Sequence, residues 1–186
     1  PIAATTASSP APARASRAKM VRTALVAVML ALPARAETPP VQRSLESLKL
    51  GDRLEHVRIV YPPIPNKEWS KSREPFGGVE RIHIQRGQAK HLPDAVESLM
   101  LGFRRGRLVT LEVRYGREFS KKKPLERLVS DLALEYGEPR RQGESYFWLD
   151  GATVLVAAQV LQPDPSGEGS ELRSSLSVMD RAYFRP

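Results

Sequence analysis

The side chains that could support chemistry are few and scattered along the chain. There are three histidines and no cysteine, which excludes thiol nucleophiles, thiolate metal ligands and disulfides. His83 and His91, with Asp94 and Glu97, are candidates for a metal site, but their spacing fits no metal-ligand template. No serine stands in a nucleophile-elbow phrase, and no glycine-rich phosphate loop occurs. We therefore expect a protein that is not an enzyme and that has no catalytic residues, metal or cofactor.

A basic stretch at positions 104–123 is the sharpest local feature. It holds eight basic residues against Glu112 and Glu118. On a hairpin its arginines would lie at the turn, and its lysines would lie beyond the far end of the returning strand, roughly 25 Å away at ~3.3 Å per residue. Two solvated ends without a joint role are one interpretation, and contact with an anionic polymer or membrane surface is the other. The residues concerned are Arg104, Arg105, Arg107, Lys121, Lys122 and Lys123.

Aromatic side chains are the second set of candidates for contact with a partner. Tyr146 and Trp148 lie in an aromatic strand before the tight-turn signal Asp150-Gly151. The proline-rich segment 61–78 is expected to be a long loop, and it carries Tyr61, Trp69 and Phe76. Exposed rings of this kind anchor interfaces. Packing of the same rings under a helix or loop is the alternative.

The first half of the chain predicts one helix and three strands. Leu54, Val57 and Val60 form the apolar stripe of a short helix, which Pro62 ends. Asp52 and Glu55 resemble a capping box at its start. The alternation of apolar and polar residues predicts a strand over 79–84 and a hairpin of 98–103 with 108–115, whose polar side faces water.

The second half repeats this order. The apolar spacing over 125–136 predicts a helix that ends at Gly137 and Pro139. A hairpin of 146–149 with 153–160 and a last strand over 172–178 follow.

The order of helix, three strands, helix and three strands indicates an internal duplication over 44–115 and 120–182. We therefore predict an α+β fold in which two α-β-β-β repeats form one antiparallel sheet with two helices packed on one face. A length of 150 residues, from 37 to 186, suits a single domain that needs no disulfide.

Residues 20–36 have the three parts of a secretory signal peptide. Arg22 precedes an uncharged run from Thr23 to Leu32, and Ala34-Arg35-Ala36 provides a small-residue cleavage site. Such a signal peptide would direct the protein to the periplasm or the outside of the cell and would be cleaved after Ala36. The run is shorter than the roughly 20 apolar residues that span a bilayer.

Residues 1–19 are rich in Ala, Ser, Pro and Thr, a composition that cannot build a core. We interpret them as lying upstream of a true start at Met20, or as a disordered leader; a transit peptide fits the cleavage pattern less well. The whole chain holds 29 basic and 21 acidic residues, but five of the basic ones precede residue 37, which leaves 24 against 21. The near balance disfavours nucleic acid as a partner.

Three short phrases resemble the small exported α+β proteins that include the SmpA/OmlA envelope lipoproteins and the β-lactamase-inhibitor-protein-like folds. The phrases are Leu48-x-Leu50-Gly51-Asp52-x-x-Glu55-x-Val57, Phe103…Gly106-Arg107-Leu108-Val109…Val113 and Leu132…Tyr136-Gly137-Glu138-Pro139. The resemblance implies binding of other proteins rather than catalysis. The lipid anchor of the envelope lipoproteins is not expected here, because the chain lacks the cysteine that would bear a lipid. The sequence thus favours an exported binding module whose partner is another envelope or extracellular protein, contacted through the open sheet face and the 61–78 loop.

Overall fold

A computed structural model describes residues 39–72, 78–163 and 169–183 of the chain, all within one compact unit, Glu37–Pro186. The predicted signal peptide over 20–36 and the segment before it lie outside the described residues. In chain order the elements are β1 (Ser44–Leu45), β2 (Leu48–Lys49), α1 (Leu54–Val60), β3 (Ser70–Ser72), β4 (Glu80–Gln85), β5 (Val96–Arg104), β6 (Arg107–Tyr115), α2 (Arg117–Lys122), α3 (Leu125–Tyr136), β7 (Arg140–Gln142), β8 (Ser145–Leu149), β9 (Thr153–Pro163) and β10 (Ser170–Asp180).

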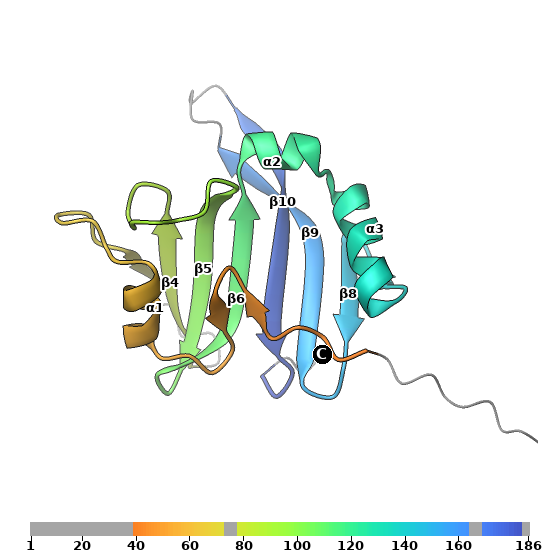
Figure 1. Cartoon of the computed structure of the whole chain (residues 1–186), viewed down its shortest axis with the longest axis horizontal. Coiled ribbons are helices and arrows are strands. Elements are labelled where there is room, and N and C mark those ends of the chain that lie inside the picture. The colour runs from red at the N-terminus through yellow and green to blue at the C-terminus, as the bar shows by residue number, and fades with distance from the viewer. Residues whose placement is uncertain (1–38, 73–77, 164–168, 184–186) are drawn as a thin grey trace, which may run out of the picture. The chain divides into compact units, whose positions relative to one another are not determined.

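Eight strands form one antiparallel sheet (Figure 1). The strand order is β3-β4-β5-β6-β10-β9-β8-β7, so the chain builds one meander from β3 to β6 and another from β7 to β10. The last strands of the two meanders, β6 and β10, pair antiparallel at the centre. Helix α1 precedes the first meander and α3 the second, and both lie on the same face of the sheet (Figure 1). The predicted fold class is confirmed, while a common origin of the two halves stays a prediction.

The structure adds short elements that the sequence patterns do not indicate. β3 lies within the 61–78 segment that was expected to be a loop, and β7 precedes β8, so each meander has four strands. Each of these two strands has three residues, too few for a two-residue alternation to stand out. None of the helices in the described part of the chain is long and apolar enough to cross a membrane.

The covered face of the sheet supplies the core. Leu99 and Leu101 of β5 lie opposite Val113 and Leu111 of β6, and all four side chains are fully buried. Apolar side chains from α1, α3 and the β1–β2 hairpin close this layer, among them Leu48, Val57, Leu125 and Leu128. The alternation predicted for this hairpin therefore points its apolar members toward the helices.

Helix α3 ends where the sequence predicts. Gly137 follows Tyr136 with φ of +80°, a backbone conformation that glycine adopts without steric cost. The Gly137 carbonyl then accepts a hydrogen bond from the indole Nε1 of Trp148 at 2.7 Å. This bond joins the end of the helix to β8 and satisfies the one polar atom of a buried ring.

The capping box predicted for α1 is wrong. The residue that caps the helix is Arg53, and no side chain makes a capping hydrogen bond there. The Asp52 carboxylate instead accepts a bond from the Lys49 backbone N–H at 2.7 Å. Asp52 therefore closes the turn that follows β2, a local competition that Asp side chains commonly enter.

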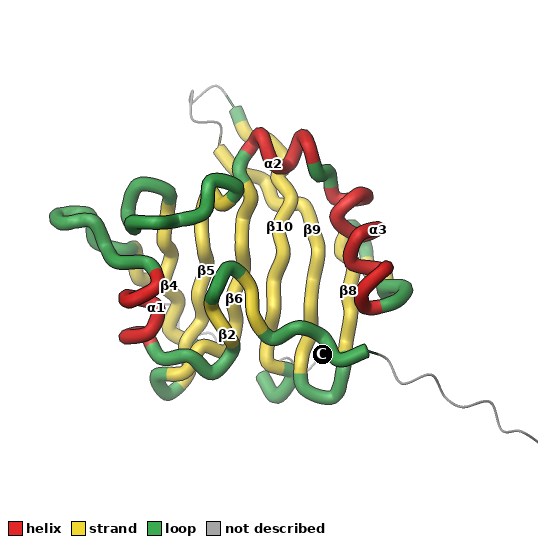
Figure 2. Tube along the Cα trace, in the orientation of Figure 1, coloured by secondary structure: helices red, strands yellow, loops and turns green. Residues whose placement is uncertain are grey.

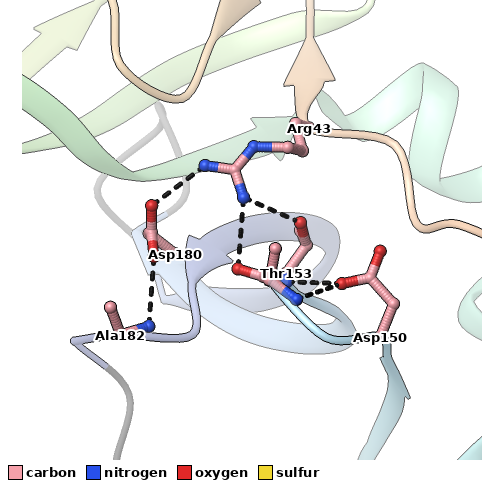
Figure 3. Close-up of polar contacts among 6 residues, drawn as sticks. Arg43, Asp150, Thr153, Asp180 and Ala182 are labelled. Carbon is pink, nitrogen blue, oxygen red and sulfur yellow. Dashed lines mark hydrogen bonds and ion pairs between the residues drawn. The ribbon is translucent and has the colours of Figure 1, made fainter.

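The lead-in segment, residues 39–43, and the β1–β2 hairpin run across the helix-covered face (Figure 2). Figure 3 shows how Arg43 fastens this segment to the second meander: its Nη2 donates to Asp180 at 2.9 Å, and its Nη1 donates to the Thr153 hydroxyl at 3.2 Å. The Ala152 carbonyl accepts a further bond from Nη1 at 3.2 Å. Arg43 thus links the start of the domain to β9 and to the end of β10.

Asp150 completes this attachment from the β8–β9 turn. Its carboxylate accepts backbone N–H bonds from Val41, Ala152 and Thr153 at 2.8, 2.7 and 2.6 Å. Burial raises the pKa of Asp150, but these three donors and nearby Arg43 outweigh that effect, so the pKa is lowered from its ordinary value of 3.8. The charged carboxylate is therefore the form that the fold stabilises.

Replacing Asp150 with Ala removes all three acceptor contacts, and we expect the free energy of unfolding to fall by about 1 to 3 kcal/mol at neutral pH. Because folding lowers the pKa of Asp150, the difference in the free energy of unfolding between the variant and the parent is largest above pH 3.8. It disappears as the pH falls through the folded pKa. Urea denaturation at several pH values measures both effects. Asp94→Ala is the control, since Asp94 is exposed and its side chain makes no hydrogen bond with a described residue. Equal stabilities of the two variants would contradict the assigned role of Asp150.

Candidate binding face

The candidate site is the face of the sheet opposite the helices, which we call the uncovered face. Strand register places its side chains in rows across the sheet. The central row runs His83, Met100, Glu112, Ser177, Val156 and Phe147 from β4 to β8. One flanking row runs Arg81, Gly102, Thr110, Met179 and Val154, and the other runs Gln85, Ser98, Arg114, Ser175 and Ala158.

The chemistry of this face changes from one meander to the other. On β4 and β6 it is polar and charged, with Arg81, His83, Glu112 and Arg114. On β8 and β9 it is apolar, and we call this part the apolar strip; its members are Phe147, Leu149, Val154, Val156, Ala158 and Val160. All of them except the fully buried Val154 are partly exposed, although no described helix lies over them.

Two hollows lie in the polar part and share Arg114. The seam hollow, of about 290 Å³, extends from Arg81 on β4 to Met179 on β10 across the central strands. The second, of about 340 Å³, lies between His83 and Gln162 near the other end of these strands. Arg114 is held in place by Glu112, whose Oε1 accepts a bond from its Nε at 2.6 Å, and both side chains are 26% exposed. Residues i and i+2 of one strand share a face, so this pair follows from the sequence spacing.

His83 lies beside this ion pair and is partly buried. Its Nε2 is shielded from solvent and has no hydrogen-bond partner among the described residues. Burial lowers the pKa of His83, the charge of Arg114 lowers it further, and Glu112 acts in the opposite direction. The fold therefore favours the neutral imidazole of His83 over the charged form. Within the described residues, no group of three or more His, Cys, Asp or Glu side chains is placed to hold a metal ion.

The basic stretch is divided between the two ends of β6. Arg104, Arg105 and Arg107 lie at the β5–β6 turn, whereas Arg114 lies within β6 and Arg117 on α2. Arg105 and Arg107 line a hollow of about 380 Å³ together with Arg53, Glu55 and Glu80. The lysines lie on and just after α2, at the opposite end of the strand (Figure 1).

Several of these basic side chains already have partners. Arg104 stacks over the Tyr183 ring at 4.8 Å, Arg107 donates to the Gly51 carbonyl, and Lys123 pairs with Asp131 at 2.7 Å. Lys121 lies 3.7 Å from Glu118, and Lys122 is exposed. The six candidates thus form two separate groups rather than one continuous basic patch that could bind an anionic surface.

Most of the aromatic candidates pack against the core. Tyr61 is 2% exposed, and its hydroxyl donates a hydrogen bond to the Glu46 carbonyl. Burial and, to a smaller extent, the charge of Glu46 raise the pKa of Tyr61 to about 12. Trp148 is equally buried, while Trp69 and Tyr146 are partly buried against the same cluster. Of the two alternatives, packing holds for Tyr61 and Trp148, because both rings fill the helix-covered layer. Phe76 lies outside the described residues.

The apolar strip was missed from the sequence, although a signal for it exists. The segment from Val154 to Ala158 is an unbroken apolar run, unlike the alternating β6. A strand that is apolar on both sides needs cover on both sides, or else presents an apolar surface. Since helix cover exists on only one side, the other side becomes the strip.

A comparison of the chain with protein-family models, curated proteins and solved structures finds no match in any of them.

The lowered pKa of His83 predicts a pH dependence of stability. The unfolded chain takes up a proton at this side chain as the pH falls below about 6.5, whereas the folded protein resists it, so the free energy of unfolding decreases as the pH falls toward the folded pKa. His83→Gln should flatten this decrease between about pH 7 and 5. The matched control is His91→Gln, because His91 is exposed. Parallel pH profiles for the parent protein and His83→Gln, measured by urea denaturation, would refute this assignment.

Proposed function

We propose that the protein is an exported, non-enzymatic binding module that contacts another protein of the cell envelope or extracellular space through its uncovered face. The observation that carries the proposal is the apolar strip beside a polar region on one sheet face. Protein interfaces combine a largely apolar centre with polar and charged surroundings. Partly exposed apolar residues that gather on one face are typical of an interaction site.

The anchor residue on this surface is Phe147. It lies on β8 opposite Val156 and is partly exposed, unlike its neighbour Trp148, which points to the other side of the strand. Aromatic side chains supply a large share of the binding energy at interfaces because they bury much area with little loss of conformational freedom. The proposal thus moves the expected aromatic contact by one residue, from Trp148 to Phe147.

Export and the class of partner rest on the sequence. The signal peptide predicted over 20–36 supports export, and the resemblance to exported α+β binding proteins supports a protein as the partner. The 61–78 loop has a smaller part than the sequence suggests, because Tyr61 is buried and Trp69 packs against the core. The sheet face is therefore the surface that we assign to the partner.

The proposal predicts that Phe147→Ser abolishes retention of the partner, with a loss of affinity of tenfold or more, since interface anchors contribute about 2 kcal/mol or more. The measurement is affinity capture from an envelope extract of the source organism, with the purified protein as bait and washes at low and high salt. Leu134→Ser is the control: Leu134 is 89% exposed, but it lies on α3 on the other side of the sheet.

A protein retained at high salt by the parent and by Leu134→Ser, but not by Phe147→Ser, supports the proposal. Retention by all three baits places the contact elsewhere and overturns it. Retention at low salt only indicates a screened electrostatic contact rather than apolar docking, and also overturns it. Circular dichroism of each variant verifies that the fold is retained.

A further inference from the structure

We propose that the seam hollow is a carboxylate-binding subsite, which takes an acidic side chain of the partner polypeptide between Arg81 and Arg114. This inference rests on the proposed function and specifies the chemistry of the partner. It follows from the charges, the hydroxyl groups and the shape of the hollow.

The charges around the hollow are unequal. Arg81 and Arg114 contribute two guanidinium groups and Glu112 one carboxylate, and that carboxylate is already bonded to the Nε of Arg114. Arg81 is exposed and forms no ion pair with any described residue. The hollow therefore has one positive charge in excess, on a side chain whose planar fork matches a carboxylate.

The hydrogen-bonding groups point to the same ligand. Thr110 and Ser177 also line the hollow, and neither hydroxyl is engaged with another described residue. Two hydroxyl groups and a guanidinium provide donors for both oxygens of a carboxylate. Met100 and Met179 supply the apolar part of the wall, against which the methylene groups of an acidic side chain can pack.

A glycine in the middle of a strand lines the hollow and leaves room for the neighbouring side chains. Gly102 lies beside Arg81 and Thr110 in the same row, and a Cβ added there would come within 2.2 Å of the Thr110 hydroxyl and 2.9 Å of the Val79 side chain. Glycine weakens a strand interior, and it is found where another group approaches the backbone closely. Its backbone φ is not positive, so the absence of a side chain, rather than a special conformation, is what this position uses.

The position of the hollow identifies a polypeptide as the source of the carboxylate. Ser177, which lines the hollow, belongs to the row that continues to the partly exposed Val156, so the hollow borders the apolar strip. A partner that covers the strip with apolar side chains brings its neighbouring residues to Arg81. A free anion would gain nothing from this proximity.

The test uses two matched probes, the peptides acetyl-Val-Glu-Val-amide and acetyl-Val-Gln-Val-amide, titrated into the purified full chain. Amide NMR signals of Gly102 and Thr110 report on occupation of the hollow. We expect saturable shifts with the Glu peptide and at least fivefold weaker binding of the Gln peptide. Arg81→Gln should weaken binding of the Glu peptide about tenfold, as expected for loss of a charge-assisted hydrogen bond.

Two further variants separate a binding role from a structural one. Arg140→Gln is the matched control, because Arg140 is an exposed arginine that lies opposite Phe147 on the same face but away from the hollow. Its affinity for the Glu peptide should equal that of the parent. Glu112→Gln removes the competing carboxylate and should tighten binding of the Glu peptide, a gain that general damage to the fold would not produce.

The inference is overturned by equal binding of the two peptides, or by unchanged affinity in Arg81→Gln. It is also overturned if acetate and inorganic phosphate shift the same signals at the same concentrations as the Glu peptide, because the hollow is then a general anion site. Failure here leaves the proposed function standing if Phe147→Ser still abolishes capture. Conversely, a Glu-specific hollow in a protein whose capture does not depend on Phe147 would remove the proposed function alone.

Discussion

The structure depends on the pairing of β6 with β10. These two strands are the last of their meanders, and their register, from Arg114 opposite Ser175 to Thr110 opposite Met179, joins two four-stranded sheets into one. The pairing leaves β3 and β7 as the edges, and each edge strand has only three residues, which limits association of the sheet with other strands. It also makes one continuous surface from a charged half and an apolar half. Neither half alone would have the composition of an interface.

The two faces of this sheet differ in burial and composition. The helix-covered face buries the leucines and valines of the core, and the lead-in segment closes over it through Arg43 and Asp150. Because stability comes from that side, side chains on the uncovered face are free to be unfavourable for folding. Three examples are Gly102 within a strand, the Nε2 of His83, which has no hydrogen-bond partner among the described residues, and the partly exposed Phe147. Such locally unfavourable choices are expected where a surface serves binding.

Sequence patterns sufficed for elements whose signals are local. The alternation in β6 correctly predicted its buried side and its solvent-facing side, which carries Glu112 and Arg114. Gly137 correctly marked the end of α3. The capping role of Asp52 failed because the carboxylate found a nearer donor in the Lys49 backbone. The neighbours of Arg114 across the sheet could not be predicted, since the β6–β10 pairing joins residues 61 to 69 positions apart in the sequence. Strand order between distant segments is a tertiary property, and the hollows exist only because of it.

The Glu112–Arg114 pair constrains any partner that covers this face. Docking would remove water from both charges, and desolvation of an ion pair offsets much of its attraction unless the remaining donors are satisfied. The Nε of Arg114 keeps its bond to Glu112, but its other N–H groups and the whole guanidinium of Arg81 would lose their hydration. A partner with only apolar groups at this point would leave those donors unpaired, which is costly. In the proposed complex the apolar strip would favour contact with many surfaces, whereas the arginines would disfavour partners without an acceptor at the right place. Selectivity would then arise from that penalty rather than from added affinity.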